Sequence, residues 1–135
     1  NDNIKNWIRS SKAKHILLIV DSCFSGTLMR GSNSDKSFLK HTKKSIDRLK
    51  NKTTRIVMTS GGNEPVVDSD GGNHSYFADK LLKVLKSKTD VFVSLELFQP
   101  VRQYVIENAL GQTPEHSSLH GTGHDGGEFL FFPKS

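Results

Sequence analysis

The stretch KHILLIVDSCFSG, residues 14–26, decides the fold class of this 135-residue chain. Its five consecutive apolar residues, 16–20, predict a β-strand that is buried on both faces. A turn of small polar residues follows at once, from Asp21 onward. A second stretch of this kind, RIVMTS at residues 55–60, predicts another buried strand. We expect these two strands to lie parallel, because strand sequence alternates with helical sequence along the chain.

Amphipathic patterns predict the helices that flank these strands. Apolar residues recur at helical spacing in three segments, residues 3–12, 75–86 and 95–110. A shorter helix is expected near residues 45–49. Pro100 should kink or split the last of them. Two successive helices return the chain to the end that it left, so a third strand, EFLFFP at 128–133, should run antiparallel at an edge. We therefore expect an open, mostly parallel α/β sheet flanked by helices, with further strands supplied from outside this sequence.

Composition excludes several classes of protein. No apolar run is long enough to cross a bilayer, so no membrane partner is expected. The net charge is +5, and residues 35–55 hold eight basic against two acidic residues. No aromatic residues interleave with these lysines as stacking platforms would, so we favour a solvated helix or loop over a nucleic-acid site. The single cysteine, Cys23, excludes a disulfide within the chain and fits a reducing, cytoplasmic location.

Cys23 lies where a ligand site is expected. Ligands of open α/β sheets bind beyond the carboxyl ends of parallel strands. Cys23 lies there, three residues after Val20, the last apolar residue of the first strand. A thiol has an ordinary pKa of about 8.5, so it needs a neighbouring base before it can act as a nucleophile at neutral pH. Position and residue type alone leave a nucleophile and an inert thiol equally open.

Three segments in order resemble the caspase and metacaspase superfamily. HILLIVDSCFSG, residues 15–26, resembles its nucleophile segment, a hydrophobic strand that ends in Asp-Ser-Cys-x-Ser-Gly or a close variant. RIVMTSGG and SYFADKLLKVL, residues 55–62 and 75–85, resemble the next strand and helix of bacterial caspase-like peptidases, with an acidic pocket loop between them. The tail resembles their closing helix and last strand. The resemblance implies that residues 1–135 are the C-terminal part of one caspase-like domain and supply its last three strands.

The resemblance also implies roles for three residues. Cys23 matches the nucleophile, and Asp21 matches the acidic residue that lines the substrate pocket in metacaspases. Asp68 stands where that family places a second pocket carboxylate. Two carboxylates would favour Arg or Lys before the cut bond, through charge-assisted hydrogen bonds. The alternatives are that Asp21 caps a turn and that Asp68 is a solvated loop charge.

The family's histidine has no match in this sequence. Its Gly-flanked motif precedes the nucleophile strand, so we expect the base on an N-terminal chain or segment of the same protein. His74 is the nearest substitute within the sequence, and His124 superficially resembles the motif but follows the nucleophile. His116 and His120 complete a run of histidines four apart, but Gly and Pro residues argue against the helix that would make it a metal site. No cofactor or metal is expected.

The sequence thus predicts a cysteine endopeptidase that acts on a protein or peptide substrate through a Cys-His dyad and an acyl-enzyme. The rival interpretation is a catalytically silent caspase-like scaffold that binds a partner. If the enzyme prefers basic residues, it is expected to be a zymogen that cuts itself in the basic segment, at Arg30, Lys40, Lys43 or Lys44.

Overall fold

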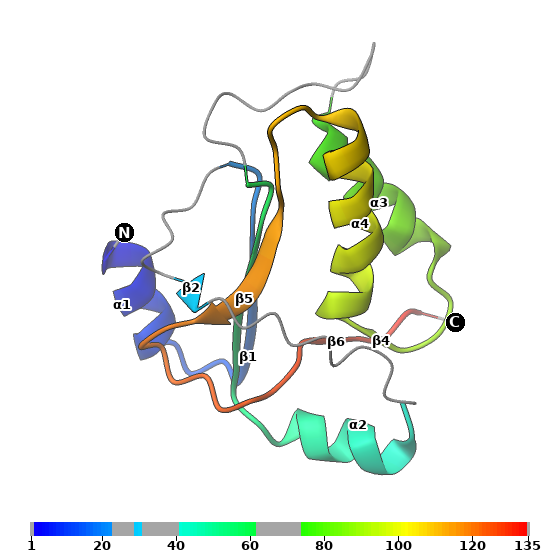
Figure 1. Ribbon diagram of the computed structural model, residues 1–135. Helices are drawn as coiled ribbons and strands as arrows, with labels where there is room; N and C mark the ends of the chain where they lie inside the picture. The colour runs from blue at the N-terminus through cyan, green and yellow to red at the C-terminus, as the bar shows by residue number, and fades with distance from the viewer. Residues whose placement is uncertain (1, 23–28, 31–40, 62–73, 135) are drawn as a thin grey trace.

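The computed structural model describes residues 2–22, 29–30, 41–61 and 74–134 of the chain (Figure 1). These residues form four helices and six strands in mixed order, namely α1 (Asp2–Ser10), β1 (His15–Val20), β2 (Met29–Arg30), α2 (Lys43–Lys50), β3 (Thr54–Thr59), α3 (Tyr76–Ser87), β4 (Phe92–Val93), α4 (Ser94–Asn108), β5 (Glu115–Leu119) and β6 (Leu130–Phe131). The predicted α/β class is confirmed.

The central sheet has four strands in the order β1-β3-β5-β2. β1 and β3 are parallel, as the sequence predicted, and they pair from His15 opposite Thr54 to Val20 opposite Thr59. β5 runs antiparallel to β3, and β2 runs antiparallel to β5. In the described part of the chain the sheet is therefore mixed, and the prediction of a mostly parallel sheet is wrong for these strands.

The third strand is also in a different place from the one predicted. The antiparallel neighbour of β3 is β5, with the sequence EHSSL, whereas residues 128–133 contain only β6. β6 pairs with β4 in a separate two-stranded sheet, where Phe92 stacks on Phe131. The sequence EHSSL has one apolar residue in five, so it lacks the apolar run by which the other strands were recognised. Pairing with β3 holds it in the sheet.

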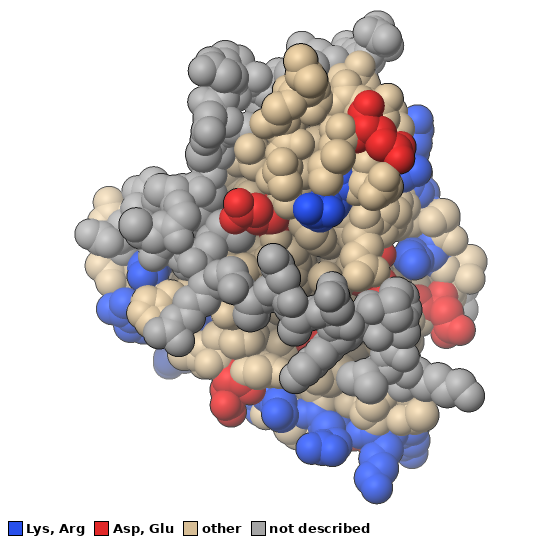
Figure 2. All heavy atoms as spheres, viewed as in Figure 1, with Lys and Arg blue, Asp and Glu red and all other residues tan. Residues whose placement is uncertain are grey.

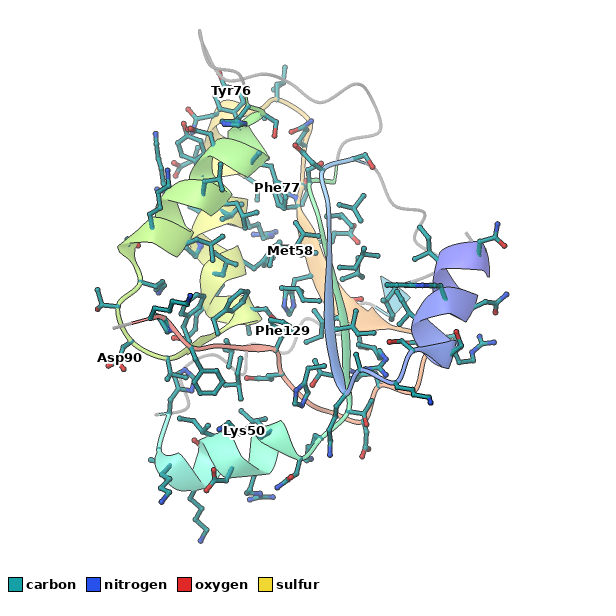
Figure 3. The ribbon with its side chains drawn as sticks, turned by 180° about the vertical axis from the view of Figure 1, so that it is seen from behind. Lys50, Met58, Tyr76, Phe77, Asp90 and Phe129 are labelled. Carbon is teal, nitrogen blue, oxygen red and sulfur yellow. The ribbon has the colours of Figure 1, made fainter. Side chains whose placement is uncertain are left out.

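Helices cover both faces of the sheet. Because side chains alternate along β3, Met58 and Val57 point to opposite faces. Met58 lies with Phe77 of α3 and Val101 of α4 in the larger core, between the sheet and these two helices (Figure 3). Val57 packs with Ile8 of α1 in a smaller core on the other face. β3 is buried at every position, which fixes the central strand on which the site depends.

α4 runs through Pro100 as one helix of 15 residues, so the expected split does not occur. Its buried residues, among them Leu97 and Val105, pack in the larger core, and this packing outweighs one lost backbone hydrogen bond. Val93 is the N-cap of α4, and its N–H donates to Glu96 Oε1 at 3.0 Å.

The described part of the basic stretch forms α2, as the sequence predicted for residues 45–49. Ile46 and Leu49 are half-buried, and the helix's lysines and Arg48 are exposed. Basic side chains gather at this end of the molecule (Figure 2). No helix within the described ranges has the length and apolar character that a membrane span needs.

Candidate active site

The carboxyl ends of β1 and β3 lie at one end of the sheet, together with the start of α3 (Figure 1). Asp21 follows β1, and Ser60 and Gly61 follow β3. The Ser60 N–H donates to the Val20 carbonyl at 3.0 Å, so the parallel ladder continues to the residue before Asp21. This ladder fixes the point at which the chain leaves the sheet toward Cys23.

Asp21 is held at this edge by Ser75, the N-cap residue of α3. Ser75 Oγ donates to Asp21 Oδ2 at 2.6 Å and accepts from the Ala78 N–H at 3.0 Å. Ser75 is buried, whereas Asp21 is exposed. The edge therefore presents an oriented carboxylate to solvent, with the positive end of a helix behind it.

Gly61, just after β3, lies against the segment that leads into β5. Its φ is +75°, and a Cβ built on it would lie 1.8 Å from the carbonyl oxygen of Thr113. Glycine alone fits both the conformation and the contact, because it has no Cβ. This approach fixes the end of β3 beside the edge that holds Asp21.

Cys23 and Asp68, the other two predicted site residues, lie outside the described residues. The described chain before Cys23 ends at Ser22, which is exposed like Asp21. The structure therefore places one of the three predicted residues at the expected edge. Sequence reasoning did not identify Ser75 as a member of the site, although a serine before an amphipathic run is a recognisable helix-cap signal.

Two histidines lie at the opposite end of β1 and β3. His15 begins β1, and its Nε2 is buried without a hydrogen-bond partner among the described residues. His124 Nδ1 accepts from the Arg55 N–H at 2.9 Å. Burial lowers the pKa of His124, the charge of Asp125 opposes this and that of Arg55 adds to it. His124 therefore anchors a turn to the start of β3, and the alternative that it acts on Cys23 is not supported.

His41 and His116 are engaged near the start of α4. His41 Nε2 pairs with Glu96 Oε1. Burial raises the pKa of Glu128, and the charge of His41 opposes this rise. His116 Nε2 shares a hydrogen bond of 2.9 Å with Ser94 Oγ, which is fully buried. His74 is exposed and directly precedes Ser75, so it lies at the same edge as Asp21.

His116 makes the stability of the fold depend on pH. Burial lowers its pKa from 6.5 to about 4, so the folded state favours the neutral ring. The stabilisation is complete above pH 6.5 and is lost as the pH falls toward 4, because the unfolded chain then binds a proton that the folded chain does not. This pKa change corresponds to about 3 kcal/mol. Urea unfolding between pH 7.5 and 4.5 should show this loss.

The His116→Phe variant should lose most of this pH dependence, at a constant cost for the unpaired Ser94 hydroxyl. His120→Gln is the matched control, because His120 is exposed just beyond β5. Equal pH dependence in wild type and His116→Phe would show that other groups carry the effect.

The spacing of His116, His120 and His124 does not produce a helical metal face. His116 lies in β5, and His124 lies in the turn beyond it. Across the described ranges, no group of three or more His, Cys, Asp or Glu side chains is placed to hold a metal ion.

The family model of the caspase domain matches residues 1–123, nearly the whole chain. The chain belongs to the caspase family. The resemblance predicted from DSCFSG and the two later segments is thus confirmed, and the family's general activity is that of a cysteine-type peptidase. Comparison with curated proteins and with solved structures gave no match. Within the matched range lie Asp21, Cys23, Asp68 and Ser75.

Proposed function

We propose that this caspase-family chain carries the nucleophile and the acidic pocket of an endopeptidase that cuts after Arg or Lys. The observation that carries the proposal is the exposed Asp21 carboxylate, held by Ser75 at the carboxyl end of β1, two residues before Cys23. A family match that spans these residues supports the same conclusion.

The chemistry follows the ordinary course of a cysteine peptidase. A histidine takes the Cys23 proton, and the thiolate attacks the carbonyl carbon of the peptide. The C–N bond breaks, the amine leaves with the proton from the histidine, and an acyl-enzyme remains. Water, deprotonated by the same histidine, then attacks the thioester, which releases the carboxylic acid and restores the thiol. The Cys23 N–H would help to hold the oxyanion.

Asp21 and Asp68 are proposed to select the cationic side chain. Within the described part of the chain, Asp21 Oδ1 has no hydrogen-bond partner, so it can accept from a guanidinium or ammonium. Charge-assisted pairs of this kind are the stronger hydrogen bonds, and a planar guanidinium can bind a carboxylate with two of them.

The catalytic histidine, which acts as the base, is proposed to come from an N-terminal chain or segment that adds strands beside β1. β1 is the edge strand of the described sheet although it is almost entirely apolar, and Ile19 is 38% exposed. An exposed apolar edge is a template for another strand. A parallel strand there would place its carboxyl end beside Asp21 and Ser22. This chain would then supply the last strands of a larger sheet.

Self-cleavage is proposed to occur in the basic segment, where the candidate sites are Arg30, Lys40, Lys43 and Lys44. Lys43 and Lys44 lie in the first turn of α2, and Arg30 lies in β2, paired with Ser118. Peptide segments are commonly recognised in extended form, so helical residues and residues already paired in a sheet are poorer targets. Lys40 lies outside the described residues.

Selectivity variants test the proposed pocket. We expect Asp21→Asn and Asp68→Asn each to lower kcat/KM for a fluorogenic peptide with Arg before the cut by about 100-fold, because each removes one charge from a pair. Rates on the Gln analogue should change much less. Asp47→Asn, on the exposed surface of α2, is the control. Equal loss on Arg and Gln peptides would contradict a role in selectivity, and no hydrolysis of any peptide by the full-length protein would favour the silent scaffold.

A further inference from the structure

Ser75 links the start of α3 to the carboxylate at the proposed pocket. We propose that Ser75 is a positioning residue, which fixes the Asp21 carboxylate in the orientation that receives a cationic substrate side chain. This inference rests on the proposed function, because it concerns the same site.

The direction of the Ser75 proton is set by the cap that the residue makes. Ser75 is the N-cap of α3, with φ −61° and ψ 163°, and its Oγ accepts from the Ala78 N–H at 3.0 Å. One lone pair is thus used by the helix, and the hydroxyl proton is directed to Asp21 Oδ2, 2.6 Å away. This distance is typical of a charge-assisted bond from a hydroxyl to a carboxylate.

Burial makes Ser75 a fixed support for an exposed group. Ser75 is only 6% exposed, so its rotamer is restricted by the packing at the start of α3. Asp21 is exposed, and without a partner its carboxylate would rotate freely in solvent. Ordering a free side chain when a substrate binds costs free energy. Ser75 lowers this cost because it holds the Asp21 carboxylate in place before the substrate binds.

The bond to Ser75 leaves Asp21 able to bind a substrate. A carboxylate has about four lone-pair sites, of which Ser75 occupies one. Oδ1 has no partner within the described ranges, and Oδ2 keeps a second lone pair. Both oxygens can therefore accept from a guanidinium while Ser75 holds the plane of the carboxylate.

A purely structural role as a helix cap makes different predictions from a positioning role. Glycine replaces a serine N-cap at a cost of only a few tenths of a kcal/mol, so Ser75→Gly removes the hydroxyl but keeps most of the cap's stability. Ser75→Thr keeps both the cap and the donor. Thr42→Gly is the matched control, because Thr42 Oγ1 caps α2 in the same way, accepting from the Ser45 N–H at 3.1 Å.

The test measures how fast Cys23 of the full-length protein is alkylated by three reagents. They are an arginine chloromethyl ketone, its glutamine analogue and iodoacetamide, which carries no side chain for the pocket. We expect Ser75→Gly to lower the rate with the arginine reagent about tenfold, the loss of one hydrogen bond to a charged group, and to leave the iodoacetamide rate unchanged. Ser75→Thr and Thr42→Gly should both keep the wild-type preference for arginine.

Two results would overturn this inference in distinguishable ways. If wild type prefers arginine and Ser75→Gly keeps that preference, the positioning role is wrong while the proposed function stands. If wild type itself reacts equally with the arginine and glutamine reagents, the proposed function fails, and the role of Ser75 fails with it.

Discussion

Replacing Gly61 with alanine is expected to lower the free energy of unfolding by about 3–5 kcal/mol, the sum of a left-handed backbone cost and a forced overlap. Its φ of +75° is disfavoured for any residue with a Cβ, and the new Cβ would lie 1.8 Å from the Thr113 carbonyl oxygen. That neighbour is backbone, so relief requires the end of β3 and the segment before β5 to separate. Thermal unfolding followed by circular dichroism should show a midpoint lower by about 10 °C or more.

Gly111→Ala separates the two causes of this loss. Gly111 has nearly the same φ, +79°, but a Cβ there would meet no atom of another described residue within 4 Å, its chain neighbours aside. It should therefore cost only the backbone term, about 1–2 kcal/mol. Equal midpoints for the two variants would show that the approach of Gly61 to Thr113 carries no energetic weight.

The sequence predicted the elements whose burial is visible in composition. The apolar stretches at residues 16–20 and 55–60 identified β1 and β3, and the alternation of strand with helical sequence predicted their parallel order. β5 was missed because its core contacts come from alternate positions in a short polar segment. Its position depends on pairing with β3 and on the His116–Ser94 bond, and neither can be read from five residues.

Local sequence motifs predicted only those residues of the candidate site that lie within the motifs themselves. The turn after β1 indicated Cys23 and Asp21 as candidates, and Asp21 lies at the carboxyl end of β1, where it was expected. Ser75 is 54 residues away from Asp21, so only the approach of the start of α3 to the carboxyl end of β1 reveals their bond. His124 illustrates the opposite case, since its glycine-rich surroundings resemble a catalytic motif while its ring is used to hold β3.

Cys23→Ala is expected to lower kcat/KM of the full-length protein for an Arg peptide by on the order of 10⁵, as loss of a catalytic nucleophile does in other peptidases. The chain has no second cysteine to replace it. Unlike Gly61→Ala, this change should leave the unfolding midpoint near that of wild type, because it adds no backbone strain. Mass spectrometry provides a second readout, since the variant should remain uncut where the wild type cleaves itself.

The isolated 135-residue chain provides the decisive comparison for Cys23. If the base comes from another segment, residues 1–135 alone should leave the Arg peptide uncleaved, although Cys23 is present. Mixing with the segment that bears the histidine should then restore turnover in wild type but not in Cys23→Ala. Turnover by the isolated chain would instead place the base within it and point to His74, which adjoins Ser75 at the same edge. Activity that survives Cys23→Ala in the full-length protein would contradict the role of the thiol, since no other residue in this mechanism forms the acyl-enzyme.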